Sequence, residues 1–528
     1  MIQSQSPAQL ATESEPPNLP PQDLLSDNVL RILYLIIGAG TLFAYNTFIS
    51  CTDYYNAINP TARNVSGQMA TYQLTSMFIV SIALLPFSTS TSTSTSTLAR
   101  KDDHAIVTTK TEKARIRNMK RFILRTIDLY SPAKRVLYGF SFTFLFLLAY
   151  LLLPPSAMTG STLNLFSTFV GIADAMSQSG LYVLAANYDK PTLTASATLG
   201  GALSGLTASF MRLATRGMFD TESVRGLRRG ADLLIWLAFG FTVVLIGSTL
   251  MVQRDLQKRQ QLKLIPSASA SIRSPDDELA EHSGRAVHVQ APLRTLGAVY
   301  SSAFLLTWKP IVSAFLNFFI TLALFPGVTL DIPSTNGTFS LGNWLPVVLI
   351  AIFNGADCAG RFILGSETMI PFRLLMARVD TEPQMLTQIV DSTCTERTNI
   401  ASIDDRHSYS TMQRRECQGH QILTFYNQLV WFPTFGRIIF FPLLSMCILP
   451  SDAPIIGPDI SRCILVFLFG VSNGFIHCGN FTVAPTLVDT EEAKNAVAML
   501  LLLAIYSGLC LGAFFGLLVE KVIRNLDR

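Results

Sequence analysis

The stretch NAVAMLLLLAIYSGLCLGAFFGLLV occupies residues 495–519 and contains no charged side chain. A helix needs about 20 apolar residues to cross roughly 30 Å of hydrocarbon, so this stretch is long enough to span a membrane. Similar charge-free runs lie at residues 136–153, 191–211, 233–253, 310–330 and 463–488. The sequence therefore predicts an all-α polytopic membrane protein.

The composition supports this prediction and excludes other classes. Of 528 residues, 49% are hydrophobic and 14% are charged, which is too few charges for one soluble globule of this size. The net charge of +4 is small, and the basic residues lie between apolar stretches, so nucleic acid is not expected as a partner. The eight cysteines lie mostly in or beside apolar stretches and form neither a disulfide framework nor a CxxC pattern. No metal site is predicted.

Apolar windows bounded by charge, proline or glycine predict about eleven transmembrane helices. These windows fall at residues 29–50, 69–87, 136–153, 162–185, 193–213, 232–252, 304–327, 343–364, 423–449, 462–485 and 496–520. Residues 1–28 are polar and proline-rich and predict a disordered tail without a signal peptide. Three long polar loops, at 88–135, 253–303 and 365–422, are read as spacers, with regulatory modification as the alternative.

Lysine and arginine counts predict the orientation. With the N-terminus cytoplasmic, the inner loops carry 26 basic residues and the outer segments 8, which places the C-terminus outside the cell or in a lumen. The rule does not account for four arginines that lie in predicted outer segments: Arg216, Arg225, Arg228 and Arg229. Two sequons, at Asn64 and Asn336, fall in predicted outer loops and are candidate glycosylation sites.

Polar groups inside the predicted spans indicate where function lies, because a charge in hydrocarbon is costly and needs a partner or a cavity. Asp357 and Arg361 are one helical turn apart, so they share a face and can form an ion pair. Asn354 lies one turn earlier on that face. Two interpretations are equally supported: a polar stripe that binds hydroxyl groups, and a structural ion pair that fixes helix packing.

Further ionisable groups repeat the same four-residue spacing. Asp174 precedes Gln178 by one turn, and Asn473 precedes His477 by one turn. A histidine with a near-neutral pKa could carry protons, although a packing role is the commoner one. The sequence has no phosphate loop, HExxH or GxSxG motif, so we predict no enzyme and no cofactor.

Several motifs resemble those of one transporter family. Residues 40–49, GTLFAYNTFI, resemble the first-span signature GTLLPWNxFI of equilibrative nucleoside transporters. Residues 353–361, FNGADCAGR, match the family's eighth-span pattern FNxxDxxGR, which is the most specific similarity. Weaker similarity in the fourth, seventh, ninth and tenth spans follows the family's order. Tyr45 stands where the family usually has tryptophan, and Leu199-Gly200-Gly201 replaces its fifth-span GQG.

The resemblance implies a fold like the major facilitator superfamily, with six helices packed against five around a site in the middle of the membrane. The six-helix bundle would comprise residues 29–252, and the five-helix bundle residues 304–528. Asp357 and Arg361 would contact ribose hydroxyls and Gln178 the base, while Asn46 and Asn354 would line the site. Tyr45 could stack on the base.

These expectations amount to a facilitative, sodium-independent carrier for nucleosides or nucleobases, with no obligate protein partner and only the lipid bilayer around it. The alternatives are a proton-coupled symporter using Asp174 and His477, a channel, and a transporter-like receptor. The plasma membrane is the predicted location, with a vacuolar or lysosomal membrane as the alternative.

Overall fold

The computed structural model describes residues 24–59, 65–87, 131–188, 190–219, 223–269, 296–334, 340–365, 426–450 and 453–526. Within these ranges every regular element is helical. Residues 1–23 of the predicted tail 1–28 and most of the loops 88–135 and 365–422 lie outside the described residues, as do the sequons at Asn64 and Asn336.

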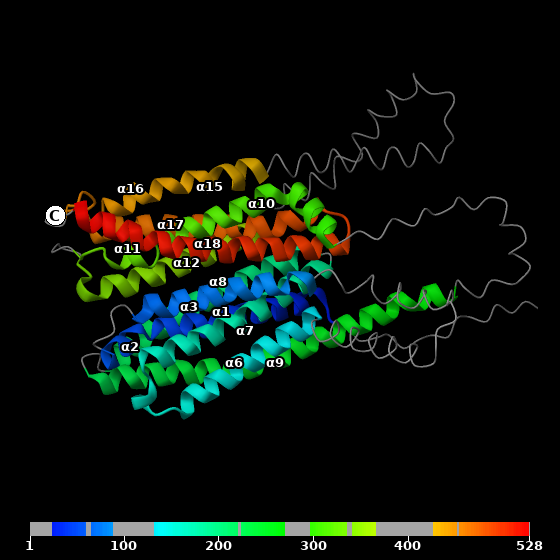
Figure 1. The fold of residues 1–528 in the computed structure, drawn as a ribbon, viewed down its shortest axis with the longest axis horizontal. Coiled ribbons are helices and arrows are strands. Elements are labelled where there is room, and N and C mark those ends of the chain that lie inside the picture. Colours follow the sequence, from blue (N-terminus) through cyan, green and yellow to red (C-terminus); the bar gives the residue numbers. More distant parts are fainter. Residues whose placement is uncertain are drawn as a thin grey trace, which may run out of the picture.

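The helices form two layers (Figure 1). We call them the N-terminal and C-terminal bundles. The N-terminal bundle contains α1 (Asp27–Ser50), α2 (Thr52–Ile58), α3 (Val65–Leu84), α6 (Pro132–Leu152), α7 (Gly160–Asn187), α8 (Pro191–Met218) and α9 (Val224–Ser269). The C-terminal bundle contains α10 (Leu296–Leu324), α11 (Gly327–Leu330), α12 (Leu345–Gly365), α17 (Asp459–Val483), α18 (Glu491–Leu526) and the segmented helix described below. We call the end at which α1 begins proximal and the end at which it finishes distal.

Local signals fix where several helices begin. The Ser26 hydroxyl accepts a hydrogen bond from the Val29 amide at 3.5 Å, and Thr159 caps α7 in the same way through Thr162. Pro132 and Pro191 open α6 and α8, where a missing amide hydrogen costs nothing. These residues separate one apolar span from the next.

The predicted spans are confirmed as helices. Within the described residues, nine helical segments are long and apolar enough to cross a membrane. The other two predicted spans correspond to α3 and α8, which are helices of 20 and 28 residues with more polar side chains. The protein is therefore an all-α, multi-pass membrane protein with two bundles.

The ninth span is a series of short segments. It runs through a π-turn at Asn427–Trp431, α15 (Phe432–Gly436), a 3₁₀ turn at Arg437–Ile439 and α16 (Phe440–Ser445). Pro433 and Pro442 each lack the amide that a continuous helix needs, which explains the interruptions.

The polar linker predicted at 253–303 is wrong at both ends. Helix α9 continues to Ser269 and α10 begins at Leu296. Residues 253–265 contain no glycine or proline and many strong helix formers, so a polar sequence there forms a helix instead of a loop. An ion pair one turn apart, Arg259 Nε to Asp255 Oδ2 at 2.6 Å, supports this extension.

Among the described residues, the hydrophobic clusters that join the two bundles lie at the proximal end. A large cluster there joins residues of α1, α6 and α7, such as Leu181, to residues of α17 and α18, such as Phe481 and Met499. At the distal end the two bundles have separate cores, one around Tyr150 and Leu234 and the other around Leu345 and Phe469. The proximal end is thus sealed by apolar packing between bundles.

Glycines set the closest helix contacts. A Cβ atom on Gly474 of α17 would overlap the carbonyl oxygen of Asp357, and one on Gly360 of α12 would overlap that of Val471. Gly508 and Gly512 of α18 likewise approach the backbone of α10 so closely that a Cβ atom would overlap a carbonyl oxygen. These contacts agree with the small-residue spacing of helices packed in membranes.

We expect Gly474→Ala to force α12 and α17 apart, because the obstructing atom belongs to the backbone and cannot rotate away. The loss of stability should be about 1–3 kcal/mol. The measurement is the midpoint of thermal unfolding of the purified full chain. Gly247→Ala is the matched control, because its Cβ would meet no atom within 4 Å. Equal midpoints for the two variants would contradict the packing argument.

Candidate functional site

The predicted pair on α12 is present. Arg361 Nη2 lies 2.7 Å from Asp357 Oδ2, and both residues are 6% exposed. Asn473 of α17 donates to Asp357 Oδ1 at 2.7 Å. Arg361 Nη1 donates to the carbonyl of Thr198 on α8 at 2.7 Å, so the ion pair reaches across to the N-terminal bundle.

A second buried cation joins this pair. Arg437 of the ninth span is 1% exposed and donates to the backbone carbonyl of Asn317 at 2.8 Å and to the side-chain oxygens of Asn317 and Asn473. Thr321 donates to Asn473 Oδ1 at 2.7 Å. Arg437, Asn317, Asn473, Asp357 and Arg361 therefore form one continuous network, which we call the polar chain. It crosses the C-terminal bundle and ends on α8.

Both asparagines predicted to line the site form hydrogen bonds with helix α8. Asn46 of α1 donates to Ser204 Oγ at 2.8 Å, and Asn354 of α12 donates to Ser209 Oγ at 2.7 Å. Gly205 leaves room for this approach, since its Cβ would lie 3.0 Å from Asn354 Oδ1. Both asparagines thus contact α8 in this structure, one from each bundle.

The polar stripe of α7 is buried and has partners from other helices. Gln73 of α3 donates to Asp174 Oδ2 at 2.9 Å, and Tyr506 of α18 donates to Gln178 Oε1 at 3.1 Å. Tyr45 is close enough to Asp174 for the two groups to interact electrostatically. The stripe therefore connects α1, α3 and α18.

Aromatic rings lie next to these polar groups and belong mostly to the proximal core. The ring centroids of Tyr182 and Phe481 are 4.3 Å apart, and His477 contacts both Phe481 and Phe318 at 5.0 Å. Arg361 is within electrostatic range of His477 and Tyr182. The ring contacts bring α7, α10 and α17 together at the point where the shared core begins.

Besides Arg437 Nε of the polar chain, three of the predicted site residues keep a buried side-chain atom without a hydrogen-bond partner. The atoms are Gln178 Nε2, Arg361 Nε and His477 Nδ1. Nearly all buried polar atoms in proteins are paired, so each of these needs water or a ligand. The first two are donors, and the imidazole nitrogen donates or accepts according to its tautomer. A ligand rich in oxygen and ring nitrogen acceptors would satisfy them.

Sequence reasoning missed several of these partners. Tyr182 continues the Asp174 and Gln178 spacing by one more turn and could have been found from it. Gln73, Tyr506 and Thr198 come from other helices, and no spacing within one helix identifies them. Among the described residues, no group of three or more histidine, cysteine or acidic side chains could hold a metal ion.

Comparison with known proteins places the chain among transporters. It is 26% identical over 351 residues to equilibrative nucleotide transporter 7 of Arabidopsis thaliana, covering 65% of this chain and 74% of that protein. It is 24% identical to equilibrative nucleoside transporter 4 of Danio rerio, over 39% of this chain and 28% of that protein. Nucleoside transporter 2 of Leishmania donovani is 25% identical over 41% of this chain and 31% of that protein. No family model matches.

Solved structures give a weaker likeness. The transporter FucP in its outward conformation aligns over 95% of this chain and 98% of its own, with 9% identity and a TM-score of 0.47. The nucleoside transporter NupG aligns over 94% and 99%, with 10% identity and a TM-score of 0.37.

We expect Asn473→Ala to destabilise the protein, because it removes the hydrogen bond to Asp357 and the acceptor of Thr321. A buried group left unsatisfied costs about 1–3 kcal/mol. The measurement is the thermal unfolding midpoint of the purified chain. Ser472→Ala is the control, since its hydroxyl bonds only the Phe469 carbonyl of its own helix. If the control lowered the midpoint as much, the polar chain would not be the cause.

Proposed function

Because the chain belongs to the equilibrative nucleoside transporter family, we propose that it carries nucleosides down their gradient by alternating access, without sodium. It is a multi-pass membrane transporter, and neither its relatives nor its motifs indicate an enzyme. The observation that carries the proposal is the Asp357–Arg361 pair, which lies in the C-terminal bundle and bonds to α8 of the N-terminal bundle.

A nucleoside suits the chemistry of this pair. Its vicinal hydroxyls both donate and accept, so a carboxylate would accept from one and a guanidinium would donate to another. In this proposal Asp357 and Arg361 hold the ribose. Gln178, with its unpaired Nε2, would bond the base, and Tyr45 would stack on it. Asn46 and Asn354 would line the route along α8.

The unequal cores support alternating access. Two bundles that share a core at the proximal end and have separate cores at the distal end would rock about the polar chain. We propose residues 29–252 and 304–528 as the rocking units. In this proposal the N-terminus is cytoplasmic, the C-terminus is extracellular or lumenal, and the protein works in the plasma membrane.

A proton-coupled symporter is the second candidate, and one observation favours it. Asp174 and His477 are both buried, and His477 Nδ1 has no partner, so a proton could be taken up there when the site opens. A channel and a transporter-like receptor are further alternatives. Counterflow, the exchange of labelled for unlabelled substrate across the membrane, distinguishes a carrier from both.

We expect cells lacking their own carriers to accumulate labelled adenosine, uridine or hypoxanthine saturably when they express this chain. Asp357→Asn and Arg361→Ala should each lower uptake at least about tenfold, because each removes one charge-assisted contact worth about 1.5–3 kcal/mol. Asp489→Asn, an exposed carboxylate outside the site, is the control. Near-normal uptake in both site variants, at equal surface expression, would refute their role.

The same assay distinguishes the candidates. Uptake that ignores a protonophore and shows counterflow supports the facilitative carrier. Uptake that collapses with the protonophore and is altered by His477→Gln supports the symporter. Linear uptake without counterflow supports a channel, and binding without uptake supports a receptor.

We expect Tyr45→Trp to change the ratio of purine to pyrimidine uptake by severalfold, because a larger ring alters stacking with the base. The measurement is the ratio of initial uptake rates for adenosine and uridine. Phe43→Tyr is the control, because Phe43 packs against Phe241 in the distal core. An unchanged ratio in Tyr45→Trp would show that this ring does not set specificity.

A further inference from the structure

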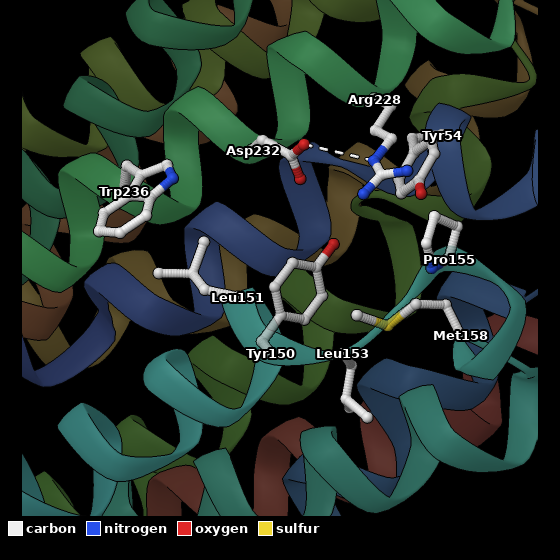
Figure 2. A pocket seen from close by; sticks show the side chains of 9 residues that line it. All are labelled: Tyr54, Tyr150, Leu151, Leu153, Pro155, Met158, Arg228, Asp232 and Trp236. Carbon is white, nitrogen blue, oxygen red and sulfur yellow. Dashed lines mark ion pairs between the residues drawn. The ribbon is translucent and has the colours of Figure 1, made fainter.

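A cavity lies at the distal end of the N-terminal bundle, and none of the predicted site residues lines it. Its volume is about 80 Å³. It opens between α2, α9 and the segment that joins α6 to α7 (Figure 2). Its lining residues are Tyr54, Tyr150, Leu151, Leu153, Pro155, Met158, Arg228, Asp232 and Trp236. Ligand pockets usually measure about 300–1,000 Å³, so this cavity is too small for a whole nucleoside.

The rim of the cavity carries one charge of each sign. Arg228 Nε lies 3.4 Å from Asp232 Oδ2, and their side chains are 44% and 41% exposed. Such a surface pair contributes little stability, at most about 1 kcal/mol. The guanidinium has five donors and the carboxylate several acceptor positions, so most of their bonding capacity stays available to a ligand.

Three aromatic side chains line the same cavity as this carboxylate. Tyr54 and Tyr150 are buried, whereas Trp236 is 56% exposed. In Figure 2 the Tyr150 hydroxyl points toward the ion pair. Aromatic rings attract quaternary ammonium groups such as choline, and a nearby carboxylate adds the opposite charge. The cavity therefore favours a small cation next to a phosphate-binding guanidinium.

The position of the cavity favours a lipid. Beyond it along α9, Leu233, Trp236 and Leu237 are exposed apolar side chains, as expected of a surface that faces acyl chains. Near the N-terminal end of α9, Arg225 and Arg229 are exposed beside Arg228 and form a basic surface. The cavity thus lies at the boundary between an apolar and a basic surface, where a phospholipid head group would lie. This also gives a local reason for arginines that the charge rule does not explain.

We propose that this cavity binds the head group of a zwitterionic glycerophospholipid. Arg228 would bond the phosphate, and Asp232 with the rings of Tyr54, Tyr150 and Trp236 would hold the ammonium group. The acyl chains would lie along the exposed leucines of α9. The proposal depends on the protein being embedded in a membrane and is independent of which solute it carries.

The test measures binding of short-chain phosphatidylcholine, below its micelle concentration, to the purified full chain through the shift in thermal unfolding midpoint. Wild type should be stabilised saturably. Arg228→Gln and Asp232→Asn should each raise the dissociation constant about tenfold, since each removes one charge-assisted contact. Arg225→Gln is the matched control, because Arg225 is exposed on the same helix and does not line the cavity.

Three results would overturn the proposal. Equal stabilisation of wild type and both cavity variants would mean that lipid acts elsewhere. Phosphatidylglycerol binding as tightly as phosphatidylcholine would mean that the ammonium group is not recognised. Free phosphocholine binding as tightly as the lipid would mean that the acyl chains play no part. None of these readouts involves transport, so they are separate from the test of the nucleoside assignment.

Discussion

A carboxylate and two guanidinium groups buried among membrane helices must be satisfied by protein atoms, because hydrocarbon offers them nothing. Asp357 lies at the centre of this constraint, with Arg361 on its own helix and Asn473 on the next. Arg437 adds a second cation to the same group and is held by Asn317. Four helical elements of the C-terminal bundle are thereby held together. The Thr198 carbonyl of α8, in the N-terminal bundle, accepts a further hydrogen bond from Arg361. Losing the charge of Asp357 or of Arg361 would leave the other buried charge without its ion-pair partner, which typically costs about 3–5 kcal/mol.

The small residues and the polar residues depend on each other. Gly360 and Gly474 let α12 and α17 approach closely enough for the Asn473 amide to reach Asp357. On α8, Gly201 and Gly205 leave space for Arg361 and Asn354 from the other bundle. A bulkier residue at these glycines would separate the polar groups as well as the helices. The glycine spacing seen in the sequence is thus part of the site as well as of the packing.

Sequence reasoning predicted the fold class, the spans and the pairing of Asp357 with Arg361, because apolar length and one-turn spacing are local properties. It did not predict that α9 would continue to Ser269, since an exposed polar helix and a polar loop have similar composition. It also did not identify Gln73 or Tyr506 as partners of the α7 stripe. Which distant helix meets a given face depends on how the bundles assemble, and no single segment encodes that.

Substitutions of apolar residues in the separate cores and in the shared core have different effects on free energy. A substitution at Leu234 or Leu345 weakens a core that stays within one bundle, so it destabilises every arrangement of the two bundles alike. If the bundles rock as proposed, a substitution at Met499 or Leu181 weakens a contact that is made when the proximal end is closed. It therefore changes the equilibrium constant between arrangements, and about 1.4 kcal/mol lost there shifts the ratio of their populations tenfold. In the proposed carrier, conservative changes of aliphatic residues far from the polar chain would change turnover and apparent affinity without altering any group that contacts the solute.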